Sequence, residues 1–212
     1  MRTQTITIGT EENFHARCDE LAIQEAAFKS ILQQFGYPPF WRRPPSFETL
    51  VHLILEQQVS LASALAALNK LKEILPEITP TAFLTLSDET LRSCYFSRQK
   101  TGYSRHLANS IQEGLLQLDK LQLLADEEVS KSLQQIKGIG RWTSDVFLMM
   151  CLQRADCFPI GDIALRNSLT TELGLSKETS HQQMLDIADG WRPYRTVAAF
   201  MLWHAYLSRR RK

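Results

Sequence analysis

The stretch LQQIKGIGRWTSDVFLMMCLQRADCFPIGDIALRNSL, residues 133–169, decides the fold of this chain. Within it, Gly138-Ile139-Gly140 separates two segments with the apolar spacing of helices, which leaves room only for a hairpin turn. Glycine relieves the steric penalty of unusual backbone angles and lets the backbone come close to a partner. The N–H groups that open the second helix suit a phosphate oxygen. On the Gly-x-Gly pattern alone, however, an ordinary helix–helix turn is the better interpretation.

The segments around this stretch also show mainly helical spacing. Apolar positions between 21 and 35 predict a first amphipathic helix, and the four prolines of 37–45 (YPPFWRRPP) predict a stiff linker. Ile6 and Ile8 alternate with polar residues and could form a strand or an extended arm. The fold class is therefore all-α. Further helices are expected at 47–59, 61–75, from Ser87, 98–114, 126–136, 141–152, 163–173, 180–188 and 193–208, the last with Pro193 in its first turn.

Composition and charge set wider limits. A chain of 212 residues with 44% apolar content fits one compact unit or two small lobes. The net charge of +1 neither proves nor excludes a nucleic-acid partner. The C-terminal segment is locally basic, which fits either a solvated tail or phosphate contact. Its basic residues are Arg192, Arg195, Arg209, Arg210, Arg211 and Lys212.

The cysteines and apolar runs exclude several classes of protein. Cysteines at 18, 94, 151 and 157 lack the short paired spacings of a zinc or iron–sulfur site, and we expect free, reduced thiols. No segment has the apolar core of a signal peptide or the ~20 apolar residues of a membrane span. We therefore expect no membrane association.

The wider stretch changes the interpretation of the hairpin. Trp142-Thr143 follows the turn directly, an apolar helix comes next, and Asp162 opens another helix. Together these features resemble the helix-hairpin-helix DNA glycosylase superfamily. The segments 56–60 (EQQVS), 97–100 (SRQK) and 191–207 (WRPYRTVAAFMLWHAYL) are similar to the bacterial and fungal 3-methyladenine DNA glycosylases, the alkylation-repair branch.

This resemblance implies two helical lobes with a DNA- and base-binding cleft. Residues 46–154 would form one lobe, which carries the hairpin at 137–140. Residues 1–45 and 155–212 would pair to form the other lobe, which carries the catalytic aspartate. The resemblance also implies removal of alkylated purines such as 3-methyladenine from duplex DNA, leaving an abasic site.

Asp162 is the expected catalytic residue. Breaking an N-glycosidic bond builds positive charge on the sugar, and a carboxylate near the anomeric carbon stabilises that charge. Asp162 could also orient or deprotonate the attacking water, and the sequence does not separate these roles. An aspartate at a helix start is in addition a good N-cap. Asp156 fits the family position less well.

Recognition of the base is expected to come from aromatic rings. Trp142 and Trp203 match pocket positions of the family, where stacking and cation–π attraction would favour a cationic alkylated base by about 1–2 kcal/mol per contact. Core packing is the alternative for a helical tryptophan, above all for Trp203. The family places an intercalating side chain at Gln58, which would fill the gap left by the flipped base. Gln58 could instead be a helix-terminal hydrogen-bonding residue.

The hairpin is expected to bind the DNA backbone and, by resemblance, a monovalent cation. The residues expected to contact DNA are Gly138, Ile139, Gly140, Arg141 and Thr143, together with Gln58. Backbone carbonyls of Gln134, Ile136 and Gly138 would hold a structural Na⁺ or K⁺.

The resemblance also predicts what the enzyme lacks. Bifunctional relatives place a lysine directly before the threonine that follows the hairpin, where this chain has Trp142. Relatives with an iron–sulfur cluster carry four cysteines near the C-terminus, and none follows Cys157. We expect a monofunctional, monomeric enzyme without a catalytic cofactor, acting on double-stranded DNA that contains alkylated bases. It would lie in the cytoplasmic nucleoid of a bacterium or in the nucleus of a eukaryote.

Two other classes stay open at this point. A non-catalytic helix-hairpin-helix DNA-binding module would explain the hairpin but not Asp162 and the two tryptophans. A helical scaffold without a DNA partner would show an absent or salt-insensitive DNA interaction.

Overall fold

A computed structural model describes residues 5–210, and these divide into two compact units. Unit 1 combines residues 5–42 with 148–210, and unit 2 comprises 43–147. The boundaries fall at 42/43 and 147/148, where the sequence suggested 45/46 and 154/155. The second boundary lies inside the helix α10 (Arg141–Met150), so this helix contributes to both units.

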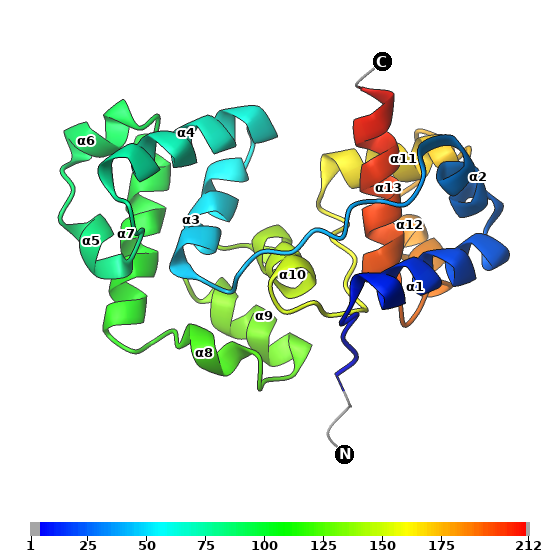
Figure 1. The fold of residues 1–212 in the computed structure, drawn as a ribbon, viewed down its shortest axis with the longest axis horizontal. Coiled ribbons are helices and arrows are strands. Elements are labelled where there is room, and N and C mark those ends of the chain that lie inside the picture. The colour runs from blue at the N-terminus through cyan, green and yellow to red at the C-terminus, as the bar shows by residue number, and fades with distance from the viewer. Residues whose placement is uncertain (1–4, 211–212) are drawn as a thin grey trace. The chain divides into compact units, whose positions relative to one another are not determined.

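Unit 2 is built on α7, which packs against α3, α5 and α6, while α3 also packs against α4 (Figure 1). α3 is almost wholly buried, in keeping with its apolar sequence. The helices of unit 2 are α3 (Phe47–Glu56), α4 (Leu61–Ile74), α5 (Pro80–Leu84), α6 (Asp88–Ser93), α7 (Arg98–Gln112), α8 (Leu118–Leu121), α9 (Asp126–Gln134) and the first part of α10.

Serine caps set where four of these helices begin. Each cap hydroxyl accepts a hydrogen bond from the backbone N–H three residues later, at 3.1–3.2 Å. Such a cap contributes about 1 kcal/mol, because it satisfies an N–H group that has no partner within the helix. The capping residues are Ser46, Ser60, Ser87 and Ser97.

Unit 1 is built on α13 (Arg195–Arg209), which packs against α1 (Glu11–Gln24), α2 (Ala26–Phe35) and α11 (Ile163–Glu172) (Figure 1). The remaining helix is α12 (His181–Asp189). Fully buried aromatic rings fill the interior, among them Phe14, Phe28 and Phe200. The all-α prediction is confirmed, since every regular element in residues 5–210 is a helix.

Two helix predictions in unit 1 are wrong in detail. The expected helix at 21–35 is two helices, because Glu25 takes an extended conformation and its carboxylate caps α2. The last helix begins at Arg195 rather than near Pro193, and Tyr194 is its N-cap residue.

The N-terminal segment is the extended arm that the alternation at Ile6 and Ile8 suggested. The Ile8 N–H donates to the Gln153 carbonyl, and the Ala155 N–H donates to the Ile6 carbonyl, both at 2.9 Å. An isolated antiparallel bridge joins Thr7 to Arg154. The arm thereby pairs with the loop that leads from α10 toward α11.

Much of the basic C-terminal segment forms ion pairs within unit 1. Arg192 and Arg195 pair with Asp156 and Asp189, and Arg209 pairs with Glu172. Arg211 and Lys212 lie outside the described residues. The three paired arginines therefore have a structural role, whatever the segment contributes to phosphate binding.

Candidate functional site

The hairpin connects α9 to α10 and is closed by backbone hydrogen bonds. The Ile139 N–H donates to the Ile136 carbonyl at 3.0 Å, and the Ser144 N–H donates to the Gly140 carbonyl at 3.1 Å. Residues 141–143 form the first turn of α10. The positive end of the helix is thus presented at the hairpin, as the sequence indicated.

The two hairpin glycines have different structural roles. Gly138 has a φ of +93°, and a Cβ at this position would lie 2.1 Å from Cγ of the Tyr103 ring. Only glycine fits there. Gly140 has an ordinary φ, and an added Cβ would meet no atom within 4 Å. The expectation that both glycines relieve backbone strain is therefore wrong for Gly140, which instead leaves open space outside the backbone.

Side chains around the hairpin limit how it could contact DNA. Ile139 is buried, and Thr143 is 1% exposed. The Thr143 hydroxyl accepts a hydrogen bond from Gln57, so a contact to DNA from Thr143 would come from its backbone. The Arg141 side chain is 75% exposed and donates to Asp145 at 2.8 Å.

Gln57 belongs to the candidate site, although the sequence alone gives it no role. Its Nε2 donates to the Gly138 carbonyl at 2.9 Å and to Thr143 Oγ1 at 3.0 Å. These contacts tie the end of α3 to the hairpin. The only signal in the sequence was the place of Gln57 in the EQQVS segment, because its partners lie more than 80 residues away.

Gln58 lies in the turn between α3 and α4, and its side chain is exposed. Its φ is +58°, which is uncommon for a residue other than glycine. The next residue, Val59, is 46% exposed. α3 ends at Glu56 rather than at the expected 59, and this early end places Gln58 on the turn.

The α3 side of this turn is held firmly. Lys100 Nζ donates to the Leu55 carbonyl at 2.6 Å, which satisfies an acceptor at the end of α3. Burial lowers the pKa of Lys100. Glu56 is 8% exposed and accepts two hydrogen bonds from Arg43, at 2.7 and 3.2 Å. Lys100 belongs to the SRQK segment that resembles the family. From α7, it supports the end of α3 next to the turn.

Asp162 caps the N-terminus of α11 in unit 1. Its Oδ1 accepts from the Leu165 backbone N–H at 2.8 Å and from the Trp203 indole N–H at 3.1 Å. The residue is half-buried. Two neutral donors on one oxygen fix the orientation of the carboxylate. The N-cap role noted from the sequence is confirmed, and it leaves the catalytic assignment open.

Trp203 was expected either at the base pocket or in the core. It is 9% exposed, it stacks on Phe200 with ring centroids 5.9 Å apart, and it meets Trp41 edge-on at 6.5 Å. This packing favours the core alternative for the ring. It also gives Trp203 a role that the sequence did not suggest, because its N–H binds Asp162.

Asp156 has quite different surroundings. Arg192 donates to its Oδ2 and Arg195 donates to its Oδ1, both at 2.6 Å. Two guanidinium groups compensate its charge and commit it to the packing of α13. Asp156 therefore suits a structural role better than a catalytic one.

Comparison with known proteins identifies the family of the chain. Residues 51–193 match the family model described as "HhH-GPD superfamily base excision DNA repair protein". The chain belongs to the HhH-GPD superfamily. The match includes the hairpin, the Gln58 turn and Asp162, so the superfamily resemblance predicted from these segments is confirmed.

Individual relatives point to one branch of the HhH-GPD superfamily. DNA-3-methyladenine glycosylase 1 of Schizosaccharomyces pombe is 32% identical over 161 residues, 74% of this chain and 71% of its own length. The structure of the 3-methyladenine DNA glycosylase of S. pombe in complex with abasic DNA has a TM-score of 0.79 at 27% identity, covering 89% of this chain and 95% of that one. DNA-3-methyladenine glycosidase of Bacillus halodurans has a TM-score of 0.74 at 25% identity, covering 99% and 95%. The alkylation-repair branch is thus confirmed. The chain spans two thirds to three quarters of the length of the first curated relatives it matches.

Two of the hairpin carbonyls expected to bind a cation accept hydrogen bonds within the protein. The Ile136 carbonyl accepts from the Ile139 N–H, and the Gly138 carbonyl accepts from Gln57. A carbonyl oxygen has two lone pairs, so one hydrogen bond does not use its full acceptor capacity. Residues 5–210 contain no group of three or more His, Cys, Asp or Glu that could hold a metal ion.

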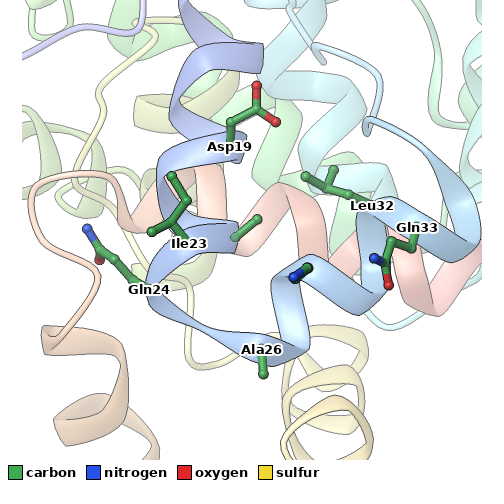
Figure 2. A pocket seen from close by; sticks show the side chains of 8 residues that line it. Asp19, Ile23, Gln24, Ala26, Leu32 and Gln33 are labelled. Atoms are coloured by element: carbon green, nitrogen blue, oxygen red, sulfur yellow. The ribbon is translucent and has the colours of Figure 1, made fainter.

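Other features of unit 1 lie outside the expected site. A cavity of about 710 Å³ opens between α1 and α2 and is lined by Asp19, Ile23, Leu32 and Gln33 among others (Figure 2). None of its lining residues was expected in the site.

Throughout the described part of the chain, no helix has both the length and the apolar character needed to cross a membrane. All four cysteines are buried and none forms a disulfide, and burial raises the pKa of Cys18 to about 12.

Proposed function

We propose that this protein is a monofunctional DNA glycosylase that removes alkylated purines such as 3-methyladenine from duplex DNA and leaves an abasic site. The observation that carries the proposal is the Asp162 carboxylate, oriented by two neutral donors in a chain of the HhH-GPD superfamily. The names of its relatives support the substrate class.

In this proposal Asp162 stabilises the positive charge that develops on the sugar. A carboxylate that is already oriented needs little reorganisation when that charge appears. An alkylated purine such as 3-methyladenine is itself cationic and leaves readily, so no enzyme acid has to protonate it. Asp162 either stabilises the cationic sugar directly or activates the attacking water, and both roles need its negative charge.

Unit 2 supplies the contacts to DNA. The helix start at the hairpin would bind a phosphate through the backbone at Gly138 to Thr143, and Arg141 would add charge. A Na⁺ or K⁺ on the carbonyls of Gln134, Ile136 and Gly138 would add positive charge next to the same phosphate. Gln58 would fill the space left by the flipped base, and Trp142 would contact that base.

The absence of strand cleavage follows from the residue at position 142. Lyase chemistry needs an amine that attacks the sugar, and an indole is not a usable nucleophile. Lys137 precedes the glycine turn, and its backbone N–H donates to His106 Nδ1 at 3.3 Å. Lys137 is exposed, and we propose that its side chain lies at the phosphate or in solvent rather than at the sugar.

The deciding experiment compares two carboxylates of unit 1. Asp162→Asn removes charge, keeps shape, and should abolish release of 3-methyladenine from methylated DNA while leaving affinity for abasic DNA within about threefold. Asp156→Asn is the matched control. It weakens ion pairs with Arg192 and Arg195 but should keep excision per folded molecule near that of the wild type. Excision by Asp162→Asn at the wild-type rate would refute the catalytic assignment.

The same assay tests the rival class. A non-catalytic DNA-binding module would release no base even as the wild-type protein. A panel of duplexes, each with one lesion, would then define the substrate range, because small changes in a pocket wall alter selectivity.

A further inference from the structure

Gln57 bridges two parts of unit 2 that the proposed function uses separately. It directly precedes Gln58, and its side chain reaches the hairpin. We infer that Gln57 is a positioning residue that couples phosphate binding at the hairpin to the placement of Gln58 in the duplex. This inference rests on the proposed function, since it assigns Gln58 and the hairpin to DNA.

The contacts of Gln57 use the full donor capacity of its side chain. A glutamine amide nitrogen carries two hydrogens, and Nε2 donates to two acceptors, the Gly138 carbonyl and Thr143 Oγ1. The first acceptor lies on the turn and the second in the first turn of α10. Leucine at this position would have similar volume but no donor.

The acceptors of Gln57 are themselves fixed. Gly138 has a φ of +93°, and the Tyr103 side chain occupies the space that a Cβ would need. Thr143 is buried in α10. Gln57 is therefore anchored to a closely packed part of the hairpin.

Two anchors define the turn that carries Gln58. Gln57 holds one side, and the Ser60 hydroxyl holds the other by accepting from the Ser63 N–H at 3.1 Å. Gln58 and Val59 lie between these anchors and are exposed. The positive φ of Gln58 is unfavourable for a residue with a Cβ, and such a conformation persists only where its surroundings enforce it.

The consequence for DNA binding is geometric. A phosphate bound at the hairpin fixes the position of Gly138 and Thr143, and through Gln57 it fixes the start of the turn. Gln58 then meets the duplex in a defined register relative to that phosphate. Without the Gln57 contacts the hairpin would still bind phosphate, but Gln58 would sample other positions.

The test measures how well the protein distinguishes damaged from undamaged duplex, and it does not depend on catalysis. For the full chain, affinity is measured for a duplex with a tetrahydrofuran abasic analogue and for the undamaged duplex. Gln57→Leu should lower the ratio of these affinities about tenfold, while affinity for the undamaged duplex changes less than about twofold. An equal loss on both duplexes would show a purely structural role and overturn the inference.

A double-mutant cycle makes the test sharper. If Gln57 acts through Gln58, then Gln57→Leu should reduce the ratio by less than about twofold in a Gln58→Ala background. The same tenfold loss in both backgrounds would show that the two residues act independently, against the inference.

Thr143→Val provides a second variant, because it removes one acceptor of Gln57 with little change of volume. It should lower the ratio about threefold and should add nothing to Gln57→Leu. Full additivity would overturn the inference. Neither affinity requires base release, so loss of the proposed enzymatic activity and failure of the coupling are separate outcomes.

Discussion

Gly138→Ala is the perturbation whose effect the structure defines most closely. Its Cβ would lie 2.1 Å from Tyr103 Cγ and 2.4 Å from Cδ2, at a φ of +93°. The left-handed conformation costs a residue with a Cβ about 1–2 kcal/mol. Displacing a packed ring costs roughly 1–3 kcal/mol more. The free energy of unfolding should therefore fall by roughly 2–5 kcal/mol. For a chain of this size, that lowers the melting temperature by about 4–20 °C.

Gly140→Ala is the matched control two residues away. Its Cβ meets no atom within 4 Å, and its φ is ordinary, so the melting temperature measured by circular dichroism should change by less than about 2 °C. Its methyl group would occupy the open space at the backbone. Affinity for undamaged duplex should therefore fall without loss of stability.

A further variant separates the two costs of Gly138→Ala. In a Tyr103→Ala background the ring atoms are gone, while the Cβ of residue 103 remains 2.6 Å from the added Cβ. Gly138→Ala should then cost less than in the wild type, but still more than the conformational term of about 1–2 kcal/mol. The reasoning is refuted if Gly138→Ala melts like Gly140→Ala, or if its cost is the same with and without the Tyr103 ring.

Three other predictions concern Trp203, His52 and Trp142. Trp203→Phe keeps a ring but removes the donor to Asp162, and should slow single-turnover excision about 10–100-fold, whereas Trp41→Phe should change it less than about threefold. Burial lowers the pKa of His52 from its ordinary 6.5, so the unfolded chain takes up the proton first and the free energy of unfolding falls as the pH drops below that value. In denaturant titrations, the free energy of unfolding should fall less between pH 7 and pH 5 for His52→Gln than for the wild type. Because position 142 holds Trp142 rather than lysine, borohydride should trap no covalent complex on damaged DNA, and efficient trapping would contradict the monofunctional assignment.

Local patterns predicted much of the site. Gly138 and Gly140 between two helical patterns indicated the hairpin, and Asp162 before an apolar helix indicated a cap. Both features depend on residues within a few positions of each other, so sequence order is enough to reveal them. Gln58 came only from the family resemblance, because nothing in the apolar spacing ends α3 at Glu56.

Contacts between distant segments could not be predicted. Gln57 and Lys100 each donate to groups 45 or more residues away, and no periodicity records such a pairing. Apolar spacing placed Trp203 on a helix but did not show what its ring faces. The break at Glu25 lies within a continuous helical pattern that contains neither glycine nor proline. Helices α5 and α8 have only five and four residues, which is too short for a periodic signal.

The division of unit 1 into two chain segments has a consequence for synthesis on the ribosome. α1 and α2 emerge before unit 2, yet they pack against α13, which emerges after it. Unit 2 is continuous and can fold while α13 is still unmade. Until then Phe14, Phe28 and Ile31, which are fully buried in the finished protein, remain in contact with solvent or chaperones. A chain that terminates before α13 would still contain unit 2 with the hairpin, but it could not complete the core of unit 1 around Asp162.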